Sequence, residues 1–152
     1  MNVILVVVAM LSSGCNASRE RPRVITYSIE RSFLEKNVPQ LGPFERCVWY
    51  HKVSEEAGWL TVPGQNDLKV EGFVLLSPQG CQALLKRFPW ESNHSDVVPN
   101  YPELARGFPP LSGDVLDSRE MITELGKTSR FRAGKMLLIP DSNVVYFMLY
   151  EM

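Results

Sequence analysis

The C-terminal segment 144–150, Val-Val-Tyr-Phe-Met-Leu-Tyr, is apolar along its whole length and rich in β-branched and aromatic residues. A strand of this composition is apolar on both faces, so the segment predicts a strand in the interior of a sheet. Residues 135–139 have a similar character and precede it across Pro140-Asp-Ser142. The two segments therefore predict a C-terminal hairpin whose second strand is central.

Further segments with the composition of strands lie at 24–33, 46–54, 59–62 and 68–76. In 46–54, Cys47 and Trp49 share one face, and this alternation is typical of a strand. Residues 68–76 end in Gly-Phe-Val-Leu-Leu, which is apolar enough to be buried on both faces, so we expect a central strand. Residues 24–33 alternate apolar and polar side chains and predict a strand, although the same apolar positions would also line one face of a helix.

Two segments predict helices. Ser77 offers an N-cap side chain, and Pro78 occupies the first helical position, where its missing N–H costs nothing. An apolar stripe at i, i+3, i+4 and i+7 follows, made of Cys81, Leu84, Leu85 and Phe88. The second helix is expected from an Asp117 cap to about Leu125, with Gly126 placed to end it.

The order of these elements predicts the fold class. Strands outnumber helices, and the chain lacks the repeated β-α alternation of doubly wound folds. We expect a single globular α+β domain over residues 24–152, with a mainly antiparallel sheet of about five or six strands, two helices and one disulfide that staples them. No internal repeat is visible in the sequence.

The N-terminal residues have the features of an export signal. Residues 3–11 are an uninterrupted apolar run, too short to cross a membrane that needs about 20 helical residues and typical of a signal peptide. The next residues, Leu11-Ser-Ser-Gly-Cys15, resemble the lipobox of bacterial lipoproteins, in which the cysteine is lipidated and becomes the mature N-terminus.

The resemblance to lipoproteins implies a signal peptide at 1–14, a lipid on Cys15 and a polar tether that completes the segment 15–23. Asn16 stands where Asp would favour retention in the inner membrane, so the resemblance implies the outer membrane, with the domain facing the periplasm. Cleavage near Ala17 without lipidation, or an uncleaved anchor, are the alternatives.

The composition limits the class of partner. The formal net charge is −1, so the chain lacks the wide basic surface that phosphate neutralisation needs, and nucleic acid is not an expected partner. No cofactor is expected. His51 with Glu55 is the only close pair of metal-ligating residue types, and we interpret it as a strand end beside an acidic turn, with no metal site.

The cysteine count favours a disulfide. Lipidation of Cys15 leaves an even pair, Cys47 and Cys81, in an oxidising compartment. Both are predicted to face the same core, so we expect them to be bonded. Such a bridge would stabilise the fold by about 4 kcal/mol in a chain-entropy treatment.

The alternative for Cys81 is catalysis. It lies in the first turns of a helix, where the helix dipole lowers a thiol pKa, and cell-wall peptidases place a cysteine in this way. His51 and His94 are the candidate bases, although neither spacing matches a known signature. Burial on the apolar stripe would raise the pKa of the thiol instead, which favours the disulfide.

The binding residues are expected among the aromatic side chains near turns, namely Trp59, Trp90 and Tyr101. Residues 90–110 form a long proline-containing excursion, and excursions of this kind often carry function. The leading hypothesis is a noncatalytic envelope lipoprotein, of the immunity or assembly-accessory type, whose domain binds a protein or cell-wall partner. A small cysteine-dependent hydrolase is the alternative.

Overall fold

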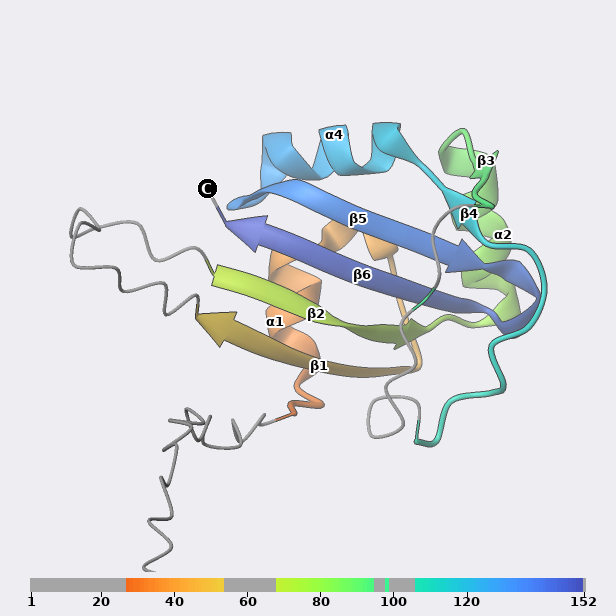
Figure 1. The fold of residues 1–152 in the computed structure, drawn as a ribbon, viewed down its shortest axis with the longest axis horizontal. Helices are drawn as coiled ribbons and strands as arrows, with labels where there is room; N and C mark the ends of the chain where they lie inside the picture. Colours follow the sequence, from red (N-terminus) through yellow and green to blue (C-terminus); the bar gives the residue numbers. More distant parts are fainter. Residues whose placement is uncertain (1–26, 54–67, 95–97, 99–105, 152) are drawn as a thin grey trace, which may run out of the picture.

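Six strands form one antiparallel sheet in the order β1-β2-β6-β5-β4-β3 (Figure 1). Their bounds are β1 (Arg46–Val53), β2 (Leu68–Leu75), β3 (Glu91–Ser92), β4 (Leu116–Asp117), β5 (Phe131–Ile139) and β6 (Val144–Glu151). The computed structural model describes residues 27–53, 68–94, 98 and 106–151. The predicted strand at 59–62 lies outside these residues.

The described residues also form the α-helices α1 (Arg31–Asn37), α2 (Pro78–Arg87) and α4 (Arg119–Thr128) and the 3-10 helices η1 (Pro39–Leu41) and η2 (Pro140–Ser142). The α+β class and the antiparallel sheet are therefore confirmed, with three α-helices in place of the two expected. No helix within the described ranges has the length and apolar character needed to span a membrane.

The central strands lie where their composition predicts. β6 pairs with β2 on one side and with β5 on the other, and Val145, Phe147 and Leu149 are fully buried along it. β2 lies between β1 and β6. The C-terminal hairpin of β5 and β6 turns through η2, with Asn143 in the left-handed conformation.

The helix starts follow the capping chemistry, with one correction. The Ser77 hydroxyl accepts a hydrogen bond from the Gly80 N–H at 3.0 Å and caps α2 as predicted. The cap of α4 is Ser118, whose hydroxyl accepts from Met121 N–H, while Asp117 is the last residue of β4. The helix also continues through Gly126 to Thr128, so the prediction that this glycine ends it was wrong.

The predicted strand at 24–33 was also wrong over its second half, where Arg31 begins α1. The buried residues Leu34, Val38 and Leu41 are spaced at i, i+4 and i+7, a helical spacing that extends past the window with the strand-like alternation. Ser28 alone keeps an isolated antiparallel bridge to Trp49 in β1.

The helices cover one face of the sheet, seen behind and beside it in Figure 1. The main core lies between them and includes Leu34 of α1, Leu84 of α2 and Leu125 of α4. A second apolar cluster lies on the opposite face, where Phe73 and Tyr146 are covered in part by residues from connecting segments. These covering residues are Tyr27, Val98, Phe108 and Val115. Part of the proline-containing excursion therefore packs on the sheet.

The second face also holds a buried carboxylate. Glu71 of β2 is only 1% exposed and accepts hydrogen bonds from the hydroxyls of Tyr50, at 2.6 Å, and Tyr146, at 2.5 Å. The Lys69 ammonium lies 2.8 Å from the same carboxylate. This Glu71 network joins three neighbouring strands, because Tyr50 belongs to β1 and Tyr146 to β6.

The two halves of the sheet share one topology. The order α1-β1-β2 recurs as α4-β5-β6, and β2 and β6 meet at the centre as antiparallel neighbours. Each unit contributes a helix to the same face (Figure 1). This pairing of two helix–hairpin units leaves β1 as the long outer strand at one edge, while the other edge ends in the two-residue β3.

The predicted disulfide is not present. Cys47 and Cys81 are both buried on the helix-covered face, as their patterns predicted, but both are free and do not lie at bonding distance. The Cys47 thiol instead donates to the Ile29 carbonyl at 3.5 Å. The apolar pattern predicts which face of the sheet each cysteine occupies but not its position along that face. It therefore could not show that the two thiols lie close together.

Candidate functional site

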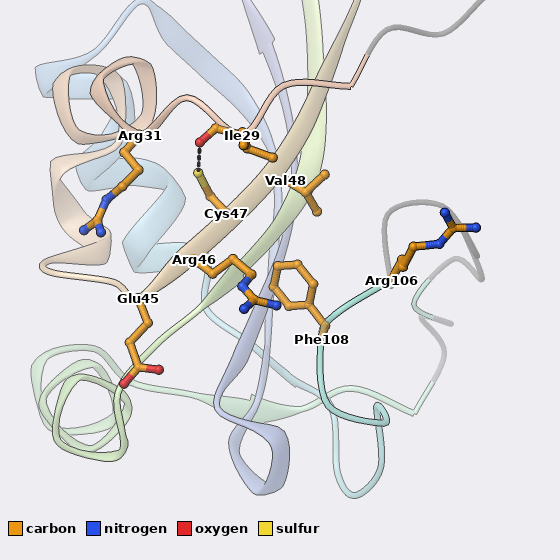
Figure 2. A pocket seen from close by; sticks show the side chains of 8 residues that line it. All are labelled: Ile29, Arg31, Glu45, Arg46, Cys47, Val48, Arg106 and Phe108. Atoms are coloured by element: carbon orange, nitrogen blue, oxygen red, sulfur yellow. Dashed lines mark hydrogen bonds between the residues drawn. The ribbon is translucent and has the colours of Figure 1, made fainter.

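An open pocket of about 380 Å³ lies at the outer edge of β1, between the start of α1 and the segment 106–108 (Figure 2). It is lined by Ile29, Arg31, Glu45, Arg46, Cys47, Val48, Arg106 and Phe108. Consecutive residues of a strand point to opposite faces, so a pocket that touches 45–48 in sequence must lie at the strand edge. We call it the β1 pocket.

The segment 106–108 is held against the sheet at two points, one on β1 and one on β2. Arg46, the first residue of β1, donates a hydrogen bond from Nη1 to the Gly107 carbonyl. Gly107 has a φ of 85°, a backbone conformation that favours glycine, and it lies directly under the Arg46 guanidinium. Phe108 packs against Phe73 on the second face, with ring centroids 6.0 Å apart. These contacts give the pocket a fixed wall.

The opposite wall is set by Arg31 at the start of α1. Its guanidinium lies over the Phe44 ring, 4.8 Å from the centroid, and donates to the Phe44 carbonyl at 2.5 Å. It also pairs with the exposed Glu35, with Nε and Oε1 3.3 Å apart. Arg31 therefore joins α1 to the segment before β1.

The pocket is electropositive. Three arginines line it against the single carboxylate of Glu45. Arg31 has its own acidic partner in Glu35, whereas Arg46 bonds a neutral carbonyl and Arg106 is exposed. Neither of these two forms an ion pair with a described carboxylate. Two cations are thus available to an anionic ligand.

Cys47 lies at the inner side of the pocket, but its thiol is not activated. Burial raises the pKa of the Cys47 thiol above its ordinary value of 9.0; the nearby Arg31 opposes this shift, and Glu35 adds to it. A cysteine nucleophile needs a lowered pKa, because the thiolate is the reactive form. The dashed hydrogen bond to the Ile29 carbonyl in Figure 2 also leaves the thiol directed at the backbone.

The residues of the predicted hydrolase are not brought together. Cys81 lies on the buried side of α2, where burial raises its thiol pKa. His51 is exposed on β1, 6.4 Å from Trp49 between ring centroids, and His94 is exposed after β3. No hydrogen bond between a cysteine and a histidine occurs in the described part of the chain. Nor does any group of three His, Cys, Asp or Glu side chains there have the arrangement of a metal site.

Trp90 has a place in the fold. Its indole N–H donates to the Leu84 carbonyl at 3.1 Å, and its ring packs on the helix-covered core while remaining partly exposed. Its predicted part in binding remains a prediction. Trp59, Tyr101 and Cys15 lie outside the described residues.

Sequence reasoning missed the β1 pocket, because its residues come from three separate segments. Arg46 and Arg106 are far apart in the chain, and nothing in their spacing shows that the two segments meet. The one partial signal was Ile29, an apolar residue in the segment 24–33 with alternating apolar and polar side chains. In the structure this side chain is 78% exposed. A large apolar side chain exposed beside Arg46 and Arg106, which form no ion pair with a described carboxylate, is typical of a binding surface.

Comparison with known proteins identified no relative. No protein family, curated protein or solved structure matches the chain significantly.

Proposed function

We propose that the protein is a noncatalytic lipoprotein of the bacterial envelope. It is anchored through Cys15 and binds a partner at the β1 pocket. The observation that carries the binding role is the pocket itself. Its Arg46 and Arg106 have no acidic partner among the described residues, and the apolar side chain of Ile29 is exposed beside them. The lipobox-like segment ending at Cys15 supports the anchor.

The state of the thiols favours binding over catalysis. A thiol hydrolase needs a thiolate and a base within hydrogen-bond reach. Burial raises the pKa of both Cys47 and Cys81, and His51 and His94 are exposed at other places. The alternative of a hydrolase based on Cys81 therefore has no geometric support in the described residues.

The pocket suits recognition because its walls are formed before a ligand arrives. The Arg46 bond to Gly107 and the packing of Phe108 on Phe73 hold one side, and Arg31 holds the other. A surface with fixed walls loses less conformational entropy on binding than one that must first be ordered. A protein or cell-wall component with an acidic group is the partner class that fits.

The proposal is tested by site-specific photo-crosslinking in intact cells. A benzophenone amino acid replaces the exposed Ile29 at the pocket, and a matched control places it at Thr123, which is exposed on α4. We expect one adduct of defined mass from position 29, lost when Arg46→Glu is added, and none from position 123. Equal labelling from both positions, or none from position 29, would contradict the binding role.

A further inference from the structure

A group of basic side chains lies where α4 turns into β5. Lys127 in the last turn of α4 and Arg130 and Arg132 after it are all exposed. The backbone of Arg132 lies directly beneath Gly126, since a Cβ on this glycine would be 3.7 Å from the Arg132 Cα. The end of the helix and the start of the strand therefore bring the three cations close together.

The group extends onto α1. The Arg130 guanidinium lies over the Phe33 ring, 5.5 Å from the centroid, and the Gln40 side chain donates to the Thr128 hydroxyl at 2.6 Å. Lys36 is exposed in the last turn of α1, between these two contacts in the chain. We call this surface the cationic patch, and its members are Lys36, Lys127, Arg130 and Arg132.

Most of the charge of the patch is available to a ligand. Arg130 pairs with Glu151, with Nη1 and Oε2 3.7 Å apart. Lys36, Lys127 and Arg132 form no ion pair with a described carboxylate. The patch is therefore net positive, although the formal net charge of the whole chain is −1. Such an uneven distribution of charge favours contact with an anionic surface.

The chain enters the domain from the same end of the sheet. Ser28 bridges Trp49 in the antiparallel sense, so Tyr27 lies farther along β1, where its ring centroid is 5.9 Å from that of Tyr50. The register places the end of β1 in line with the end of β6 and the start of β5, next to the patch. The β1 pocket lies around Arg46 at the opposite end of β1 (Figure 1).

We infer that the cationic patch rests on the anionic phospholipid headgroups of the membrane that holds the anchor, so that the β1 pocket faces away from the bilayer. The inference rests on the anchor at Cys15 in the proposed function. Residues 15–27 span at most about 40 Å when fully extended, so the anchor keeps the patch near the headgroups. A tethered contact forms at a high effective concentration, and clusters of basic residues beside an anchor bind anionic lipids.

The first test is cosedimentation of the mature chain with lipid vesicles. The chain begins at residue 15 and has Cys15→Ser, so that no acyl group contributes to binding. The probe is an equimolar mixture of phosphatidylcholine and phosphatidylglycerol, and the matched control is phosphatidylcholine alone. We expect binding to the mixed vesicles that salt weakens, because salt screens exposed charges. Equal binding to both kinds of vesicle, or no binding to the mixed ones, would overturn the inference.

The second test removes charge from the patch. Each basic residue near an anionic surface contributes about fivefold in affinity, so the pair Lys127→Gln, Arg132→Gln should weaken binding to the mixed vesicles about twentyfold. The control pair Lys86→Gln, Arg119→Gln makes the same change of charge at exposed positions on α2 and at the start of α4, and should leave binding unchanged. A thermal melt of each variant checks the fold. Equal losses from the two pairs would refute the inference.

The orientation has its own readout in the acylated protein, inserted in the same mixed vesicles. A benzophenone amino acid at position 132 should form adducts with phospholipid, whereas one at position 29 should not. Equal lipid adducts from both positions would rule out the orientation. If position 29 captures a partner in cells while the vesicle tests fail, the binding role stands and this inference does not. If the vesicle tests succeed and position 29 captures nothing, the patch binds lipid and the proposed role of the β1 pocket is wrong.

Discussion

The Glu71 network makes a quantitative prediction about stability. Its carboxylate is 1% exposed and accepts from the hydroxyls of Tyr50 and Tyr146, with Lys69 at 2.8 Å. Glu71→Gln keeps the shape but removes the charge. The amide nitrogen must then face one of the groups that donates to the carboxylate, and Lys69 loses its ion pair with Glu71.

The magnitude follows from the type of contact that is lost. Hydrogen bonds to a charged group contribute about 1.5 to 3 kcal/mol each, and breaking a buried ion pair costs about 3 to 5 kcal/mol. The Lys69 side chain is 27% exposed and can regain water, so the cost lies toward the lower end of this range. We expect Glu71→Gln to lower the free energy of unfolding by about 3 kcal/mol and the melting temperature by about 10 °C.

The assay is urea denaturation followed by circular dichroism, with Glu124→Gln as the matched control. Glu124 pairs with Arg87 at the surface, where the side chains are 38% and 50% exposed, so its loss should cost less than about 1 kcal/mol. A Glu71→Gln variant that loses no more than the Glu124 variant would refute the reasoning. It would mean that the network does not stabilise the fold.

The remaining predictions concern the thiols and two glycines. Without reductant, Cys47 and Cys81 should both resist alkylation in the folded domain and both react in urea. A reductant should not shift the melting temperature. If neither thiol reacted in urea, the two cysteines would be joined by a disulfide instead. Burial raises the pKa of both thiols above 9.0, so the unfolded state loses these protons first as the pH rises. The free energy of unfolding should therefore fall above pH 9.0 by more in the native protein than in a Cys47→Ala, Cys81→Ala variant. An equal change of the denaturation midpoint with pH in the two proteins would contradict this. Gly72→Ala places a Cβ 2.2 Å from the Val48 carbonyl oxygen and should destabilise by about 3 kcal/mol or prevent folding, whereas Gly126→Ala in α4 meets only ordinary contacts at 3.7 Å and should stabilise by about 0.5 to 1 kcal/mol; similar melting temperatures for the two variants would be inconsistent with the packing described.

The sequence predicted the parts of the fold that depend on local signals. β6 and β2 are central because their segments are apolar on both faces, and such segments must be covered. α2 begins at Pro78 because a capping serine and a proline at the first helical position act within a few residues. These signals do not depend on distant partners.

The errors came from elements that depend on neighbours in space. Residues 31–37 form a helix because Leu34 packs in the core and Phe33 stacks on Trp49, with centroids 4.4 Å apart, and a short window could not show this. The two-residue strands depend on pairing between distant segments, since β4 pairs with β5 and β3 pairs with β4. The disulfide failed for a similar reason, because a shared face does not fix the distance between Cys47 and Cys81.

The candidate site was the least predictable part. Trp90 was expected at a binding surface from its aromatic character, and the structure gives it a hydrogen bond to Leu84 and contacts with the core. The β1 pocket depends on Arg46 reaching Gly107, a contact between residues 61 positions apart. Only the folded sheet brings these groups together.

The intact mass of the protein extracted from the producer's envelope, after alkylation in urea without reductant, tests the account most directly. We expect a chain that begins at Cys15, carries acyl groups on that residue and has two alkylated thiols, Cys47 and Cys81. A chain that keeps residues 1–14 and has an alkylated, unacylated Cys15 would contradict the lipid anchor and with it the placement of the domain in the envelope.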